Sequence, residues 1–383
     1  MSVAIPHDAR PVPVAVRRAV RRAVRRAVRL TAVAASVSTA GLPAQSAAPG
    51  DAKRARVDAL FAEFARAGAP GAAVVVARRD SVILSAGYGL ADVEHRVPVT
   101  PSTAFRLASV SKQFTAAAIL TLVDAGRLSL DARLGDVLAD VPAYARGINV
   151  RHLLTHTSGV PDYEPLLGSG AGPQLEDRDV PALLHRAKTL YFAPGTSWRY
   201  SNSGYALLAL VVERVSGESF ASYLRRHVFD RAGMPTAVAH QEGVDTVTRR
   251  AYGHSLEGTT WRRTDQNRTS AVLGDGGIYA SAEELARWSA ALDRHVVLPV
   301  ALFNEMTTPA RLTSGAATAY GYGWFLDSHR GRPRQRHEGD SIGFRTAIQR
   351  YPDVGLTVIV LVNRGAAPID ALSDGVANVF LDP

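Results

Sequence analysis

The sequence has no cysteine among its 383 residues. This absence excludes disulfide bonds, thiol catalysis and cysteine-bound metals, and it removes the thiol to which a bacterial lipoprotein attaches its lipid. Histidine occurs eleven times but is scattered, without an H-E-x-x-H pair or a cluster at ligand spacing. The sequence therefore predicts a protein that uses no metal and needs no cofactor.

Lysine is nearly absent too. Only Lys53, Lys112 and Lys188 occur among the 44 basic residues, and the rest are arginines. A lysine that is kept where arginine is the default suggests a task that arginine does not perform, namely giving up its proton. Lys112 stands out, because it lies three residues after Ser109 in an apolar, helix-patterned run, FRLASVSKQFTAAAIL.

The positive charge is concentrated at the N-terminus. The chain has a net charge of +9, and residues 1–46 hold eight arginines and one aspartate, so their net charge of +7 leaves +2 for the rest. Basic residues, a short apolar run and small residues between Ala44 and Ala48 follow in the order of a secretory signal. We therefore expect a periplasmic or secreted protein with no nucleic-acid partner and no stable membrane anchor. Two alternatives stay open: an over-long predicted start, and an arginine-rich arm that binds nucleic acid or a membrane surface.

The hydrophobic pattern after this leader predicts one domain over residues 47–383. Strand patterns occur near both ends of the domain, and the pattern between them is mainly helical as far as about Arg263. This order predicts an α/β (α+β) fold in which one antiparallel sheet is flanked by the N- and C-terminal helices. The sheet lobe is expected at about 51–108 and 266–383, with a mainly helical lobe inserted at about 109–265.

Ser109 and Lys112 fit nucleophilic catalysis. Residues at positions i and i+3 share one face of a helix, and burial in a cleft favours a neutral amine over an ammonium ion. A neutral amine accepts the proton of a serine hydroxyl, which is otherwise a poor nucleophile. The alternative is a surface lysine beside a serine that caps a helix. Two later clusters supply what such a nucleophile needs: Y-S-N, with Tyr200 and Asn202, and H-E-G, which begins at His337.

Together these three motifs, in this order and at these separations, resemble the active-site motifs of the serine β-lactamase and penicillin-binding-protein superfamily. The flanking phrases HLLTHTSGVPDY, GDGGIYASAEELARW and YGYGW resemble the branch that holds class C β-lactamases, D-alanyl-D-alanine carboxypeptidases, D-aminopeptidases and family VIII esterases. The resemblance covers roughly residues 57–380. It implies a β-lactamase/transpeptidase-like fold and hydrolysis of an amide or ester through an acyl-serine.

The resemblance also implies roles for single residues. Ser109 would attack the substrate carbonyl. Lys112 and the phenol of Tyr200 would relay its proton, and which of the two is the general base stays open. Asn202 would orient Lys112 and the substrate amide, and His337 stands where many relatives have lysine.

Four further residues are expected near the substrate. The backbone N–H groups of Ser109 and Asp340 would form the oxyanion hole, and Gly339 and Glu338 belong to the third motif beside it. Tyr163 is expected either to line the mouth of the cleft or to pack on the helical lobe.

The third motif departs from the pattern of many relatives. Its middle residue is often a threonine that binds a substrate carboxylate, whereas here it is Glu338, whose negative charge would repel such a group. Replacing lysine by His337 also removes a permanent positive charge. Both changes favour a D-amino-acid peptide or a small ester as substrate, ahead of a β-lactam or D-alanyl-D-alanine. A non-catalytic penicillin-binding sensor is the rival interpretation.

One competing motif names another serine. G-D-S-I-G at residues 339–343 matches the G-x-S-x-G nucleophile elbow, with Ser341 as nucleophile. That elbow requires a helix directly after the serine, whereas the sequence that follows is strand-patterned. We therefore expect Ser109, not Ser341, to be the nucleophile.

Overall fold

The computed structural model describes residues 49–168 and 172–382. The leader at 1–46, which the sequence predicts to be an export signal, lies outside the described residues. Among the helices of the described part, none has the length and apolar content to cross a membrane. The described residues belong to one compact unit, Ala48–Pro383.

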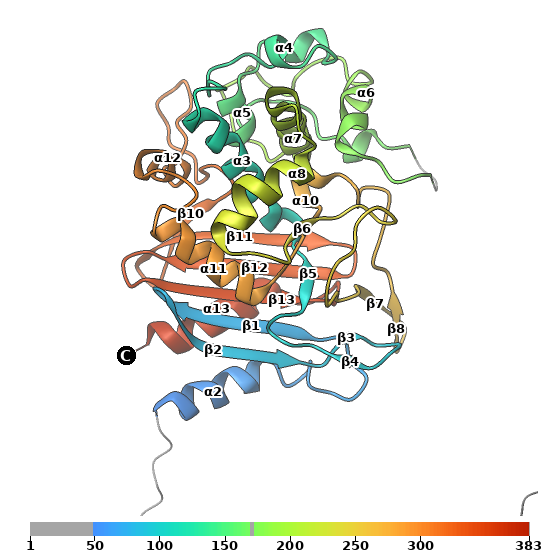
Figure 1. Cartoon of the computed structure of the whole chain (residues 1–383), viewed down its shortest axis with the longest axis vertical. Helices are drawn as coiled ribbons and strands as arrows, with labels where there is room; N and C mark the ends of the chain where they lie inside the picture. Colours follow the sequence, from blue (N-terminus) through green and yellow to red (C-terminus); the bar gives the residue numbers. More distant parts are fainter. Residues whose placement is uncertain (1–48, 169–171, 383) are drawn as a thin grey trace, which may run out of the picture. The chain divides into compact units, whose positions relative to one another are not determined.

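A six-stranded antiparallel sheet forms the base of this unit, in the order β10–β11–β12–β13–β1–β2 (Figure 1). The pairing of β1 with β13 joins the N-terminal hairpin to the C-terminal strands, with Ala72 opposite Val362. The strands are β1 (Ala72–Arg78), β2 (Ser81–Tyr88), β10 (Phe325–His329), β11 (Arg332–Ser341), β12 (Phe344–Tyr351) and β13 (Leu356–Val362).

Alternate residues of the central strands face two different cores, as the period of two in a strand requires. Val74 and Val76 of β1 pack under α2 (Pro49–Leu60) and α13 (Ile369–Leu381), whereas Ala73 and Val75 face α11 (Ala282–Asp293) and the helical lobe. Every residue of β13 is buried, because this strand is covered on both faces. The predicted fold, an antiparallel sheet flanked by the terminal helices, is confirmed.

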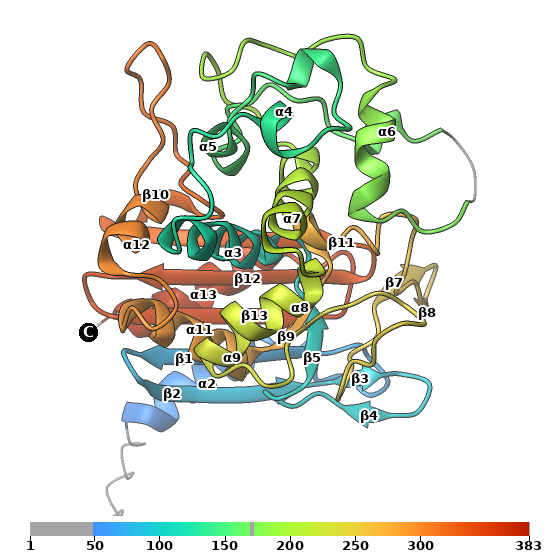
Figure 2. The same ribbon diagram turned by 45° about the horizontal axis from the view of Figure 1, so that its top comes forward.

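The helical lobe is built around α3 (Lys112–Asp124), which packs against α7 (Asn202–Ser216) (Figure 2). Helix α3 is buried on all sides over most of its length. It is therefore a core helix, and a polar residue on it needs partners inside the protein. The other helices are α4 (Leu134–Val137), α5 (Val150–Leu154), α6 (Val180–Leu184), α8 (Phe220–Leu224), α9 (Asp230–Ala232), α10 (Leu273–Gly276) and α12 (Val300–Met306).

Two parts of the expected pattern are corrected by the structure. The helical pattern expected as far as Arg263 ends earlier, because residues 238–263 hold three short strands. The sequence pattern did not predict strand β11, because its residues, RPRQRHEGDS, are mostly polar. The short strands are β3 (Leu90–Asp92), β4 (Val97–Pro98), β5 (Ala104–Arg106), β6 (Val238–Ala239), β7 (His254–Glu257), β8 (Thr260–Arg263) and β9 (Ile278–Ser281).

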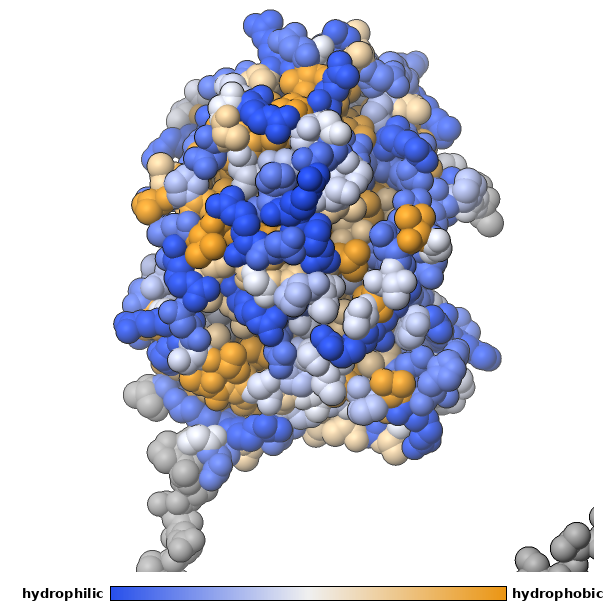
Figure 3. Space-filling view, viewed as in Figure 1, coloured by the Kyte–Doolittle hydropathy of each residue, from blue (hydrophilic) through white to orange (hydrophobic). Residues whose placement is uncertain are grey.

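The face of the molecule seen in Figure 1 is mainly hydrophilic, and its hydrophobic residues form separate patches (Figure 3). Single exposed apolar residues are normal on a soluble surface. Val82 and Ile83 on the edge strand β2 are among the described apolar residues that are exposed. This face therefore offers no continuous apolar band.

Asn363, directly after β13, ties together segments that are far apart in sequence. Its Oδ1 accepts a hydrogen bond from the N–H of Gly71 (2.7 Å), and its Nδ2 donates to the carbonyls of Ala91 (3.1 Å) and Tyr252 (2.8 Å). The residue is completely buried. Its side chain therefore satisfies backbone groups that water does not reach.

We expect Asn363→Ala to lower the free energy of unfolding by about 2 to 4 kcal/mol, because it leaves buried backbone groups unpaired. Urea denaturation of the variant and of the exposed control Asn304→Ala measures the difference. Equal midpoints for the two variants would contradict this role.

Candidate active site

The segment that carries Ser109 is held from two sides. Strand β5, just before it, pairs with β9, and the carbonyl of Leu107 accepts a hydrogen bond from the Thr346 hydroxyl of β12 at 2.7 Å. Ala108 then adopts a left-handed conformation with φ of 48°, which is unfavourable for a residue with a side chain. This sharp turn places Ser109 in a short 3₁₀ turn that leads directly into α3.

Gly339 allows β11 to approach this turn closely. A Cβ atom at Gly339 would lie 2.2 Å from the carbonyl oxygen of Leu107 and 2.2 Å from Oγ1 of Thr346. Such distances are far shorter than any van der Waals contact, so a side chain does not fit here. Position 339 of the third motif therefore requires glycine, because only glycine lets β11 lie against the turn that carries Ser109.

Lys112 is completely buried in the first turn of α3. Its Nζ lies 3.1 Å from Oγ of Ser109, 2.8 Å from Oδ1 of Asn202 and 2.8 Å from the backbone oxygen of Asp275. Three oxygen atoms from three separate segments therefore surround this nitrogen. Its contact with the serine hydroxyl is the geometry that proton transfer requires.

Tyr200 also lies close to the lysine amine. Nζ of Lys112 is 4.9 Å from the centroid of the Tyr200 ring, and the buried hydroxyl of Tyr200 makes no hydrogen bond within the described residues. Burial raises the pKa of Tyr200, whereas the nearby Lys112 opposes this rise. The phenol is thus an available donor or acceptor beside Ser109, and Lys112 is the group that favours its anionic form.

A cluster of aromatic rings supports Tyr200. The ring of His156 lies 4.3 Å from it, and that of Phe325 is nearly parallel to it at 6.5 Å. Nδ1 of His156 accepts a hydrogen bond from the N–H of Ser201 at 3.2 Å, which fixes the loop before α7. Burial, Lys112 and His337 lower the pKa of His156 well below its usual value. His156 therefore supports the site as a neutral ring.

His337 is also neutral. Burial, together with the positive charge of Lys112, lowers its pKa to about 3. Its Nδ1 lies 2.7 Å from the carbonyl oxygen of Glu338, which only accepts, so Nδ1 carries the proton and Nε2 accepts from the Tyr320 hydroxyl at 3.0 Å. The third motif thus has no positive charge at the position where many relatives have lysine.

Asn202 links Lys112 to two acidic residues in the segment between α5 and α6. Its backbone N–H donates to Oδ2 of Asp162 at 3.0 Å, and its Nδ2 donates to Oε1 of Glu164 at 3.3 Å. Burial and the charge of Asp162 raise the pKa of Glu164. Because Asn202 also binds Lys112, the exposed carboxyl group of Glu164 is one side chain removed from the catalytic amine.

Ser109 opens into a pocket of about 640 Å³ that also contains Tyr200. Strand β11 borders this pocket. The neighbouring strand β10 pairs only with Arg332–Arg336 of β11. On that edge, residues 337–341 therefore pair with none of the described strands. A free strand edge offers backbone N–H groups to a substrate. The oxyanion hole of Ser109 and Asp340 stays a prediction, and this edge is where it would lie.

The charged side chains that line the pocket are mainly acidic. Glu338 lines it and forms an ion pair with Arg336, while burial raises the pKa of Glu338 and Arg336 opposes the rise. Asp340 is exposed and forms an ion pair with Arg345. Asp370, in the first turn of α13, lines the pocket with no ion-pair partner among the described residues. The negative charge of Glu338 is thus present in the pocket but partly balanced.

Tyr163 does not line the mouth of the cleft. It is completely buried, and its hydroxyl donates to Oδ2 of Asp275 at 2.8 Å. Burial raises the pKa of the Asp275 carboxyl group to about 7, and Lys112 opposes the rise. Sequence reasoning missed Asp275, because GDGG only signalled a backbone constraint. The packing alternative for Tyr163 agrees with the structure.

Ser341, the competing nucleophile, ends β11 and is followed by a tight turn at Gly343 and then by β12. No helix follows the serine, so the nucleophile elbow is not formed. Ser341 borders a second pocket of about 440 Å³ together with Glu164 and Asp340.

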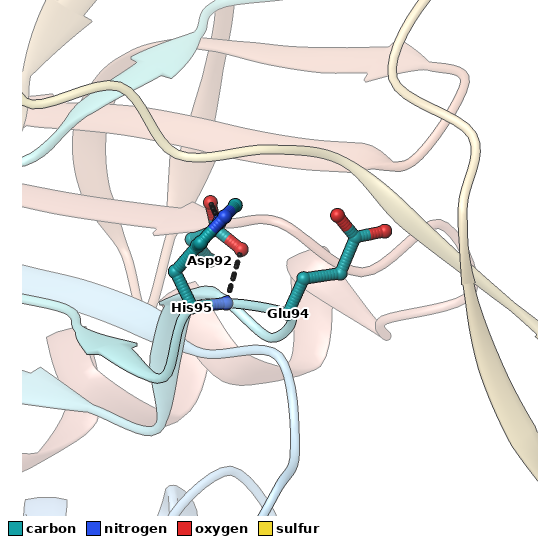
Figure 4. A group of neighbouring side chains, drawn as sticks. All are labelled: Asp92, Glu94 and His95. Atoms are coloured by element: carbon teal, nitrogen blue, oxygen red, sulfur yellow. Dashed lines mark hydrogen bonds and ion pairs between the residues drawn. The ribbon is translucent and has the colours of Figure 1, made fainter.

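Within the described ranges, one group of possible metal ligands lies close together: Asp92, Glu94 and His95 (Figure 4). The N–H of His95 donates to Oδ1 of Asp92 at 3.0 Å, and Nδ1 of His95 lies 2.8 Å from Oδ2. These two contacts close the turn between β3 and β4. The group has a structural explanation, and the predicted absence of a metal stays a prediction.

Comparison with known proteins identifies the family. A profile named Beta-lactamase matches residues 57–378, which is most of the chain. The protein therefore belongs to the beta-lactamase family of serine hydrolases, as the three motifs predicted.

The relatives include penicillin-binding proteins and D-aminopeptidases. Penicillin-binding protein 4* of Bacillus subtilis is 29% identical over 82% of this chain and 72% of its own length, and a D-aminopeptidase of Gluconobacter oxydans is 30% identical over 82% of this chain. This chain spans 59% of that D-aminopeptidase. The crystal structure of a penicillin-binding protein from Bacillus halodurans superposes with a TM-score of 0.72 at 30% identity, over 85% of this chain and 98% of the other.

We expect Lys112→Arg to lower kcat/KM by roughly 10²- to 10⁴-fold, because a guanidinium keeps its proton and does not act as a base. Hydrolysis of p-nitrophenyl butyrate measures the loss, with Ser109→Ala as the inactive reference. Lys188→Arg, at a lysine outside the site, serves as the matched control. A Lys112→Arg enzyme with nearly full activity would show that Lys112 is structural.

Proposed function

We propose that this protein hydrolyses the amide or ester bond that follows an N-terminal D-amino acid with a free amino group. The observation that carries the proposal is the charge of the cleft. Its carboxyl groups outnumber its cations, and the position where a cation would bind a substrate carboxylate holds the neutral His337. A cationic substrate fits this environment better than an anionic one.

The reaction would follow from the contacts of Ser109. Its hydroxyl proton passes to the pair formed by Lys112 and Tyr200 as Oγ bonds to the substrate carbonyl carbon. The pair then returns the proton to the leaving nitrogen or oxygen as the bond to carbon breaks. Water repeats both steps on the acyl-serine and releases the acid.

The position of Tyr200 supports a proposal for the two sides of the site. The group that protonates the leaving atom must lie next to it, and Tyr200 borders the pocket of Ser109, Phe325 and Glu338. The leaving group would therefore occupy that pocket. The acyl group would lie on the opposite side, towards Asn202 and the second pocket, which is bordered by Glu164.

Glu164 is the proposed partner of the substrate amino group. It is exposed, it borders the acyl-side pocket, and Asn202 holds its carboxyl group near the catalytic lysine. An ammonium group bound there would place the carbonyl of the same residue near Ser109. The 30% identical D-aminopeptidase supports this choice.

The acidic groups on the leaving side argue against the runner-up substrates. β-Lactams and D-alanyl-D-alanine peptides both present a carboxylate, and Glu338 and Asp370 border the pocket that it would enter. Penicillin binding is the second candidate function, because of the similarity to penicillin-binding protein 4* of B. subtilis. We also propose export to the periplasm or medium, because of the basic and apolar leader.

We expect Glu164→Gln to lower kcat/KM for a D-aminoacyl p-nitroanilide by roughly 10- to 100-fold, because one hydrogen bond to a charged group is lost. The N-acetylated anilide, which lacks the ammonium group, should change little. Glu94→Gln, at an exposed carboxylate on the β3–β4 turn, is the matched control. The idea fails if both anilides lose activity equally, or if neither D-aminoacyl substrate is cleaved by the unaltered enzyme.

A second change tests the charge of the leaving-group pocket. Glu338→Thr removes a carboxylate and adds a hydroxyl donor, while Arg336 keeps its ion pair with Asp327. We therefore expect kcat/KM for nitrocefin to rise roughly 10- to 100-fold. Hydrolysis of the neutral p-nitrophenyl butyrate should change little. The ratio of the two is the measurement, and an unchanged ratio would mean that Glu338 does not act on the substrate carboxylate.

A further inference from the structure

A buried carboxyl group adjoins the catalytic lysine without bordering the pocket of Ser109. Asp275 is 6% exposed. Its backbone oxygen lies 2.8 Å from Nζ of Lys112, and its side-chain Oδ2 accepts from the Tyr163 hydroxyl at 2.8 Å. The same residue therefore contacts Lys112 through its backbone and holds an ionisable side chain close by.

The position of Asp275 is fixed by the segments around it. Asp177 accepts hydrogen bonds from the N–H groups of Leu273 (2.9 Å) and Gly274 (3.0 Å), and Thr115 of α3 donates to the carbonyl of Gly274 at 2.7 Å. A Cβ atom at Gly274 would lie 2.4 Å from the carbonyl oxygen of Tyr205. The short helix α10 thus has no room to shift relative to Lys112.

The charge of Asp275 depends on its neighbours. Burial raises the pKa of its carboxyl group to about 7, while the positive charge of Lys112 and the hydrogen bond from Tyr163 lower it. Asp275 in turn raises the pKa of Tyr200. The titratable groups that act on Asp275 or respond to it come from α3, the loop at 162–164, the 3₁₀ turn at 177–179 and the loop before α7: Lys112, Asp162, Tyr163, Glu164, Asp177 and Tyr200.

We propose that Asp275 is a positioning residue whose negative charge stabilises the proton that the Lys112–Tyr200 pair takes from Ser109, and that Tyr163 keeps this carboxylate ionised. When Oγ of Ser109 bonds to the substrate carbon, its proton moves to the pair, which gains one positive charge. A nearby carboxylate stabilises that charge. The same carboxylate opposes the earlier loss of one proton from the pair to solvent.

These two effects give Asp275→Asn a distinct signature. The plateau of kcat/KM should fall by roughly tenfold, and its acidic limb should move to lower pH by roughly one unit. The direction of the shift holds whether Lys112 or Tyr200 is the base, because in both cases the site loses one proton before it reacts. A purely structural defect would lower the rate at every pH without moving the limb.

Tyr163→Phe should move the limb in the opposite direction. It removes the hydrogen bond that favours the ionised carboxylate, so Asp275 ionises at a higher pH. Because the full rate requires Asp275 to be ionised as well as the pair to have lost its proton, the acidic limb then moves to higher pH. The ring remains, so the packing around it is preserved. Asp92→Asn, at another buried carboxyl group that contacts His95 and not Lys112, is the matched control and should leave the limb in place.

The proposal rests on Ser109 as the nucleophile, but not on the specificity for amino groups. The pH dependence is therefore measured with the neutral p-nitrophenyl butyrate and, independently of turnover, by the rate at which a fluorophosphonate labels Ser109. If the unaltered enzyme is not labelled, the proposed function fails. If labelling occurs but the limbs of Asp275→Asn and Tyr163→Phe coincide with that of the unaltered enzyme, this inference is wrong. Should Asp275→Asn not fold, Tyr163→Phe alone decides.

Discussion

The burial of one lysine amine organises the active site. Lys112 has no exposed surface, and a buried amine is tolerated only when oxygen atoms surround it. Ser109, Asn202 and the backbone of Asp275 provide those atoms, from positions 3, 90 and 163 residues away in the sequence. Each of these segments must be folded and in place before the amine is satisfied. The chemistry and the packing of the two lobes therefore depend on the same contact.

Each lobe contributes something that the other does not have. The helical lobe supplies a rigid buried helix, so that Lys112 and Ser109 keep one geometry. The sheet lobe supplies the free edge of β11, where the oxyanion hole is predicted. Gly339 joins the two, because only a residue without a side chain lets this edge reach the turn at Leu107. Rigid contacts of this kind hold reacting groups in position before the substrate arrives.

The sequence was sufficient to predict the fold and to name two of the three residues that contact the amine, Ser109 and Asn202. Strands β1 and β13 are strongly apolar and so are easily predicted. The three motifs are recognisable because they occur in a fixed order along the chain. The sequence did not predict strand β11, because its residues do not alternate between apolar and polar. Many of them are charged and pair with each other, as Arg336 and Glu338 do. The neutral state of His337 and the contact of Asp275 with Lys112 depend on burial and on contacts between distant segments. Local sequence patterns do not contain that information.

In the proposed function, different residues carry reactivity and specificity. Lys112 is completely buried, and Ser109 and Tyr200 are half-buried in the wall of the pocket, so a changed charge here would alter the proposed proton relay itself. The groups proposed to discriminate substrates, Glu164 and Glu338, border two different pockets. Glu164 reaches Lys112 only through Asn202, and Glu338 forms its ion pair with Arg336. A substitution at either residue changes the charge that a substrate meets and leaves the three oxygen contacts of Lys112 in place. Under the proposed function, the charge at these two positions therefore sets whether this protein prefers a carboxylate-bearing or an amino-bearing substrate, while the nucleophile stays the same.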